Sequence, residues 1–143
     1  MQYRLIALLF PIIILSSCHK KPMHDDGFLP EDPNKASSEL QNLRQLAQGE
    51  KKMLREDARG KLLCYIRRGM SKEHVEVWMG NAQDEYETED SVSGEKHIIA
   101  TYHCRLPELE GTKLEGRHLM TIMYEHTQDG LRVVKVEGPH FPD

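Results

Sequence analysis

The chain has 143 residues, and its 19 lysines and arginines against 23 aspartates and glutamates give a formal net charge of −4 at pH 7. This acidic balance, with no basic stretch interleaved with aromatic residues, argues against a nucleic-acid partner and against electrostatic attachment to anionic lipid. The length allows one domain with one hydrophobic core.

The first residues have the layout of a secretory signal peptide. Arg4 is followed by the apolar run Leu5–Leu15, which is shorter than the about 20 residues that a membrane-spanning helix needs. The run ends in Leu15-Ser16-Ser17-Cys18, which resembles the lipobox of bacterial lipoproteins. The resemblance implies that residues 1–17 are a signal peptide and that Cys18 carries a covalent lipid. We expect no cofactor beside that lipid.

Two or three acyl chains on Cys18 would anchor the protein stably to a membrane. The next residue is His19, whereas an aspartate there would favour retention in the inner membrane, so the resemblance implies the outer membrane, with the domain facing the periplasm. Cys64 and Cys104 then remain as an even pair in an oxidising compartment. They could form a disulfide or stay as two buried thiols, and the sequence leaves both readings open.

Residues 18–37 are rich in prolines and charges and are predicted to be the lipidated N-terminus and a flexible tether. Phe28 and Leu29 are its bulky apolar pair, and we expect a solvated tether, with docking of this pair on another element as the alternative. From Ser38 the pattern becomes helical, with an S-x-x-Q capping box and apolar residues at helical spacing. This predicts a helix over residues 38–67, bent or broken near Gly49, whose apolar stripe packs on its own domain or on a partner helix.

A second helix is predicted directly after the first. Gly69 suits the left-handed residue that follows a helix end, and Ser71 suits the N-cap of the next helix. Val75 and Trp78 lie on its apolar face, and Gly80 ends it. The acidic stretch 81–96 that follows lacks the spacing of an EF-hand loop, so we expect a solvated, mobile loop and no metal site.

Three runs near the C-terminus are rich in β-branched and aromatic residues. They cover His97–Cys104, His118–His126 and Leu131–Val136, and Asp129-Gly130 between the last two is a strong hairpin signal. Residues 139–143 are expected to be a tail.

The stretch from Tyr65 to Gly80, YIRRGMSKEHVEVWMG, resembles the opening of the conserved domain of the SmpA/OmlA (BamE-like) family of small outer-membrane lipoproteins. The resemblance implies an α+β domain over residues 38–138, in which two N-terminal helices pack on a three-stranded antiparallel sheet (ααβββ). The matched residues Gly69, Ser71 and Gly80 would be structural turns and caps, so no binding residue is transferred.

These features predict a non-catalytic, lipid-anchored module that binds a periplasmic or outer-membrane protein and supports assembly of an envelope complex. The alternative is a periplasmic inhibitor or ligand-binding module on the same scaffold, because a fold does not fix a function. The eight histidines do not form an H-E-x-x-H motif, and His97 and His103 would lie about 20 Å apart on one strand. We therefore predict no catalytic and no metal-binding residue.

Overall fold

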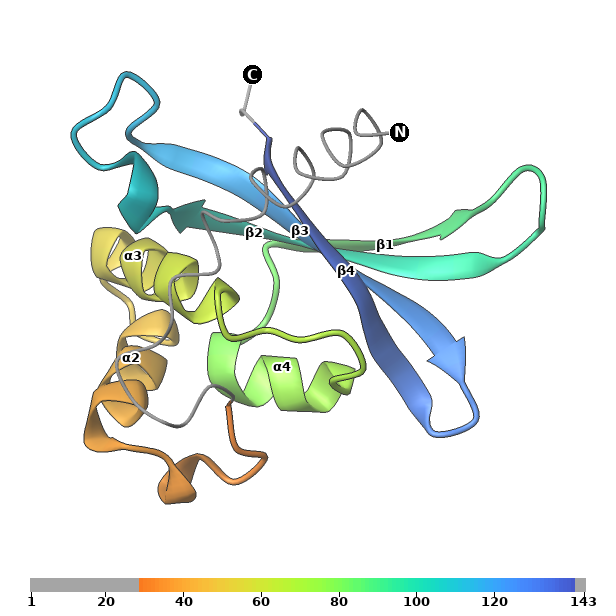
Figure 1. Ribbon diagram of the computed structural model, residues 1–143, viewed down its shortest axis with the longest axis horizontal. Helices are drawn as coiled ribbons and strands as arrows, with labels where there is room; N and C mark the ends of the chain where they lie inside the picture. The colour runs from red at the N-terminus through yellow and green to blue at the C-terminus, as the bar shows by residue number, and fades with distance from the viewer. Residues whose placement is uncertain (1–28, 141–143) are drawn as a thin grey trace, which may run out of the picture.

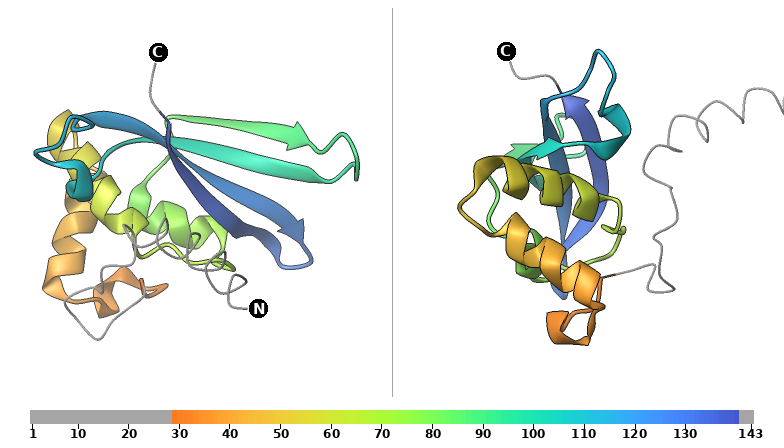
Figure 2. Two further views of the ribbon diagram at one scale, coloured as in Figure 1. Left: turned by 45° about the horizontal axis from the view of Figure 1, so that its top comes forward. Right: turned by 90° about the vertical axis from the view of Figure 1, so that its left-hand side faces the viewer.

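The computed structural model describes residues 29–140, in which three α-helices lie against a four-stranded antiparallel sheet (Figure 1). In chain order the elements are the short 3-10 helix η2 (Pro33–Lys35), α2 (Ser38–Ala47), α3 (Lys52–Leu63), α4 (Lys72–Met79), β1 (Asp84–Glu89), β2 (Lys96–Arg105), the 3-10 helix η3 (Pro107–Leu109), β3 (Arg117–Thr127) and β4 (Gly130–His140). Each strand pairs with its sequence neighbour, in the order β1-β2-β3-β4. The helices gather on one side of the sheet, as Figure 2 shows. None of the helices between residues 29 and 140 is long and apolar enough to cross a bilayer.

The predicted α+β class and the helices-on-sheet arrangement are confirmed, and the predicted number of strands is wrong. Residues Asp84–Glu89, expected to belong to a mobile loop, form the edge strand β1, which pairs with β2 from Asp84↔Thr101 to Glu89↔Lys96. This strand buries almost nothing, because five of its six residues are exposed and Thr88 is half-buried. Its apolar signal is therefore absent, and backbone pairing to β2 holds it in place.

The predicted helix over residues 38–67 is two helices, because the chain breaks between Ala47 and Lys52. The guanidinium of Arg55 donates to the Gly49 carbonyl at 3.0 Å and so satisfies a backbone group of the break. The N-cap of α2 is Ser37 and not the predicted Ser38, since the Ser37 hydroxyl accepts from Leu40 N at 3.3 Å.

The tether boundary predicted at residue 37 lies too far along the chain, because Leu29 is 1 % exposed and belongs to the core. The indole of Trp78 donates to the Pro30 carbonyl at 2.8 Å, and the imidazole of His74 lies 2.6 Å from the Leu29 carbonyl. Two backbone groups of the incoming chain are thus fixed on α4. Residues 29–37 are consequently part of the domain.

The remaining strands follow the sequence prediction closely. β2 and β3 each extend one residue beyond the predicted run at both ends, and β4 extends four residues further at its C-terminal end. β3 alternates as expected, with one face buried against the helices. The buried residues on that face are His118, Met120, Ile122 and Tyr124. The predicted tail is partly wrong, because β4 continues to His140.

The buried side chain of Arg59 joins the helices to each other and to the sheet. From α3, its Nε donates to the Ala47 carbonyl at the end of α2 and to the Met79 carbonyl at the end of α4, both at 3.0 Å. Its guanidinium also lies 5.3 Å from the ring centroid of Tyr102 on β2. The C-terminal carbonyls of a helix carry partial negative charge, so a cation is well placed there.

The variant Arg59→Lys should lose about 2–4 kcal/mol of unfolding free energy, because an ammonium cannot reproduce the guanidinium's planar set of donors and leaves buried carbonyls without partners. Chemical denaturation followed by circular dichroism would measure the loss. The matched change at exposed Arg68, Arg68→Lys, should stay within about 0.5 kcal/mol. Equal effects at the two sites would contradict this assignment.

Gly60 sets the distance between α3 and the sheet. A Cβ added at Gly60 would lie 2.0 Å from the backbone oxygen of Arg105, at the end of β2. A side chain of any size would therefore push the helix away from the strand. The glycine costs helix propensity and allows the close approach of two backbones.

Gly60→Ala should destabilise the domain by about 1–3 kcal/mol through overpacking, although helix propensity alone would favour alanine by about 1 kcal/mol. The sign of the change in thermal unfolding midpoint tests this. Lys61→Ala, an exposed position on the same helix, is the control and should move the midpoint little. A stabilised Gly60→Ala protein would show that the approach of α3 to β2 is wrong.

Candidate functional site

The predicted lipidation site and the predicted turn and cap residues lie in different parts of the chain. Cys18, the predicted lipidation site, lies outside the described residues 29–140. The three turn and cap residues are described, and two of them are confirmed. Ser71 caps α4 by accepting from His74 N at 3.0 Å, and Gly80 ends α4 with a φ of +78°.

Gly69 has the predicted left-handed backbone, with a φ of +93°, but it does not end a helix, because α3 already stops at Leu63. The glycine instead turns the connecting loop against the sheet. Gly69 N donates to the Val133 carbonyl and Val133 N donates to the Met70 carbonyl, both at 2.8 Å. The loop thereby covers part of the outer edge of β4.

The two cysteines are not joined to each other by a disulfide. Cys104 lies on the buried face of β2 with no exposed surface, and burial raises the pKa of its thiol to about 12. Cys64 is half-buried at the end of α3, with its sulfur 3.8 Å from a carboxylate oxygen of Glu108. A buried thiol with so high a pKa is not a nucleophile at neutral pH.

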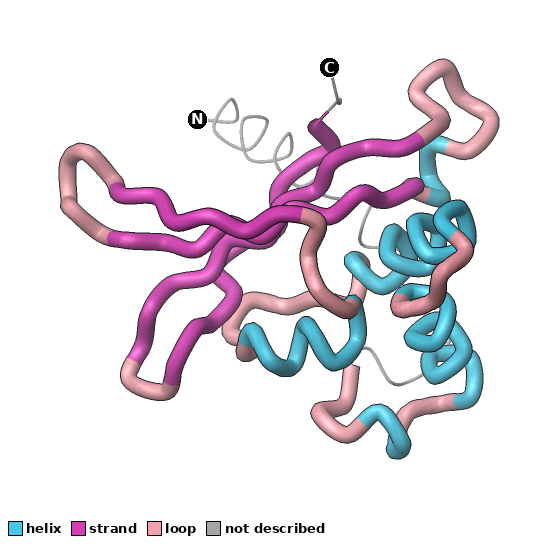
Figure 3. Tube along the Cα trace, turned by 180° about the vertical axis from the view of Figure 1, so that it is seen from behind, coloured by secondary structure: helices cyan, strands magenta, loops and turns pink. Residues whose placement is uncertain are grey.

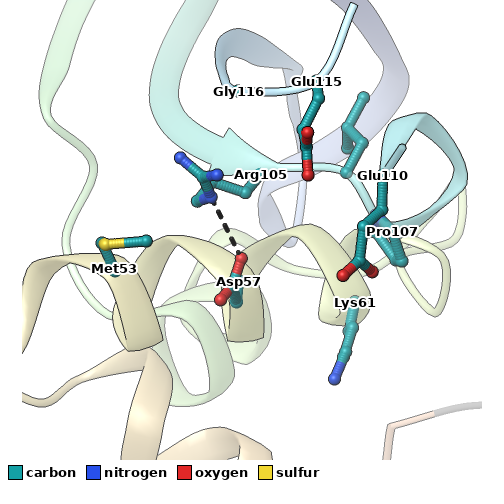
Figure 4. A pocket seen from close by; sticks show the side chains of 9 residues that line it. Met53, Asp57, Lys61, Arg105, Pro107, Glu110, Glu115 and Gly116 are labelled. Carbon is teal, nitrogen blue, oxygen red and sulfur yellow. Dashed lines mark ion pairs between the residues drawn. The ribbon is translucent and has the colours of Figure 1, made fainter. Parts of the chain in front are cut away.

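A cavity of about 310 Å³ lies between α3 and the end of β2 (Figure 4). Its charged groups partly neutralise each other, since Arg105 Nε lies 3.4 Å from a carboxylate oxygen of Asp57 and points toward it. The lining residues are Met53, Asp57, Lys61, Arg105, Leu106, Pro107, Glu110, Glu115 and Gly116. The lining contains three carboxylates and two cations, and no cysteine, serine or histidine. The lining therefore offers no nucleophile paired with a base.

Several of the histidines within residues 29–140 make structural contacts. His103 Nδ1 accepts from the guanidinium of Arg117 at 3.3 Å, and burial together with that cation lowers the pKa of its imidazole. His118 is buried on β3 with its Nε2 2.6 Å from the Leu114 carbonyl. Within residues 29–140 no group of three histidine, cysteine or carboxylate side chains is placed to hold a metal ion.

The side of the sheet away from the helices carries a mixed polar and apolar surface. The register places Tyr86 of β1 beside Ile99 of β2, and Ile99 beside Met123 of β3, so these three form one row across the sheet. Tyr86 is 47 % exposed, while Ile99 is buried and Met123 is half-buried. Sequence reasoning missed the row because it missed β1. No hydrophobic alternation marks β1, because none of its residues is buried.

Comparison with family models, with curated proteins and with solved structures found no match to this chain. The resemblance of Tyr65–Gly80 to the SmpA/OmlA family therefore stays a prediction.

The Cys104 thiol should resist alkylation by N-ethylmaleimide in the folded protein at pH 7.5 and react fully after unfolding in guanidinium, because its reactive thiolate is suppressed by burial. Peptide mass spectrometry assigns the site. Half-buried Cys64 is the internal comparison and should be modified earlier in the same sample. Rapid labelling of Cys104 without denaturant would show that this face of β2 opens.

Proposed function

We propose that this chain is a non-catalytic lipoprotein of the outer membrane, anchored by Cys18, whose domain faces the periplasm and binds a protein partner of an envelope complex. The observation that carries the proposal is the tetrapeptide Leu15-Ser16-Ser17-Cys18 at the end of a short apolar run. The resemblance of Tyr65–Gly80 to the SmpA/OmlA family supports the same setting.

The chemistry of the described residues favours binding over catalysis. Charged side chains between α3 and the sheet are held in ion pairs, Arg105 with Asp57 at 3.4 Å and Arg117 with buried Glu56 at 3.6 Å. The buried cysteine has a thiol pKa raised far above neutral pH. Groups held in this way stabilise the contact between α3 and the sheet and are not poised for proton transfer or nucleophilic attack.

The architecture supports a protein partner. Helices cover one face of the sheet, and the other face carries the row Tyr86, Ile99 and Met123. One-sided sheets of this kind can bind partners through the uncovered face or through an unpaired edge strand.

Cys18→Ala should abolish incorporation of labelled palmitate and move the chain from the membrane fraction to the soluble fraction, because the anchor needs the thiol for its thioether. Metabolic labelling followed by fractionation measures both effects. Cys64→Ala is the matched control and should leave labelling and membrane attachment unchanged. Persistent labelling of the Cys18→Ala chain would refute lipidation at this residue.

The partner is tested by affinity purification of the wild-type chain from native envelopes in mild detergent, with Cys18→Ala alongside. Co-purification of outer-membrane assembly proteins, lost with the variant, supports the proposed role. A wild-type chain that purifies alone, or with a soluble hydrolase, contradicts it and favours the inhibitor alternative.

A further inference from the structure

The two edges of the sheet are finished in different ways. The β4 edge is covered at Val133 by the loop residues Gly69 and Met70, and Pro139 near its end has no N–H to offer. No described segment lies along the outer side of β1, which projects with β2 away from the helices (Figures 1 and 3). Among residues 29–140, β1 therefore presents the continuous unpaired edge.

The register identifies the backbone groups that this edge exposes. Asp90 N donates to the Glu95 carbonyl at 2.8 Å, so residues 90 and 95 are a hydrogen-bonded pair of the antiparallel ladder. Alternate pairs exchange such bonds, and residues 84, 86 and 88 consequently turn their N–H and C=O groups toward β2. Glu85, Glu87 and Glu89 turn theirs outward.

The same three residues point their side chains to one face. Glu85 and Glu87 lie opposite Ala100 and Ile98, on the helix side of the sheet, and successive glutamates are about 7 Å apart. Lys72 of α4 pairs with Glu85 at 2.8 Å, while Lys96 reaches Glu87 at 4.0 Å with both side chains more than half exposed. A surface pair of that kind is weak, so most of the negative charge is available to a partner.

The charge of the whole chain is concentrated on this arm. Residues 84–98 contain six carboxylates and one lysine, a formal charge of −5, against −4 for all 143 residues. The rest of the chain therefore sums to +1. An acidic arm on a nearly neutral body attracts a basic partner to this edge and repels a second copy of the same edge.

We propose that β1 binds an extended basic segment of a partner protein, which adds to the sheet as an antiparallel fifth strand. Its lysines or arginines occupy alternate positions, opposite Glu85, Glu87 and Glu89. An apolar residue between them lies beside Tyr86, which is exposed on the other face. Backbone hydrogen bonds hold the segment, and the alternating charges fix its register. The inference rests on the proposed interaction role and names the chemistry of its partner.

The test uses the full chain in dodecylmaltoside and the fluorescein-labelled peptide Thr-Lys-Thr-Lys-Val-Lys-Thr. Fluorescence anisotropy should show saturable binding. Methylation of the three lysine backbone nitrogens keeps the charge and removes the donors that face β1, so it should weaken binding at least tenfold. Methylation of the valine and central threonine nitrogens, which face away, should leave the affinity within about twofold.

The protein variants separate charge from backbone pairing. Glu87→Gln removes one carboxylate, and Glu87→Pro removes the same carboxylate together with the outward N–H, leaving the bonds of β1 to β2 in place. Glu87→Pro should bind at least tenfold more weakly than Glu87→Gln. Circular dichroism and the thermal midpoint check that both are folded. If Glu87→Pro unfolds, the two methylated peptides still decide.

Equal binding of both methylated peptides would overturn the proposal, because charge alone would then explain the attraction. Absence of saturable binding to the wild type would overturn it too, as would dimerisation of the chain that Glu87→Pro abolishes, since the edge would then serve a second copy. These failures are distinct from failure of the interaction role, which the envelope purification tests independently of this peptide.

Discussion

One buried guanidinium decides how the helical layer is held. The side chain of Arg59, in the middle of α3, donates to the last carbonyls of α2 and α4. Its guanidinium carbon lies over the ring of Tyr102 on β2. Each of these helices is short, and helices of this length are marginal alone. The ends of α2 and α4 converge on this cation of α3, because their last carbonyl oxygens are buried and need a donor. The Tyr102 hydroxyl adds to the same junction by donating to the Gly80 carbonyl at 2.9 Å. The layer is therefore organised by polar contacts at its centre.

The sequence predicted well the features that depend on local residue patterns. Ser71 and Gly80 delimit α4 through cap chemistry, and β3 alternates because one of its faces is buried. The features that it missed depend on distant partners. The need for glycine at position 60 comes from the backbone of Arg105, which is 45 residues away in the chain. The role of Arg59 could not be predicted either, because a pattern of charges along a helix does not reveal that the ends of two other helices lie beside it.

The strand β1, which was not predicted, also depends on a distant partner. β1 has no buried face, so hydrophobic alternation could not indicate it, and its partner β2 supplies the order. Lys72 of α4 also holds the strand, because it pairs with Glu85 of β1 as well as with Glu76. Partial burial lowers the pKa of the Lys72 ammonium, but the two carboxylates favour its charged form more strongly, so the pKa is raised. Acidic residues here are compatible with a strand because they disfavour pairing with another copy while leaving the backbone free. For the candidate site, sequence supplied the position of Cys18, which lies outside the described residues, and the edge was visible only in three dimensions.

The burial of Leu29 beside α4 sets how much chain is left between the domain and Cys18. If Cys18 is held at the bilayer surface, only eleven residue steps separate it from the buried leucine, a contour of about 40 Å even when fully extended. A tether ending at residue 37 would have reached nearly twice as far. Such an anchor would confine the domain to a thin layer beside the membrane, which would raise its local concentration toward membrane-bound proteins and place partners deeper in the compartment out of range.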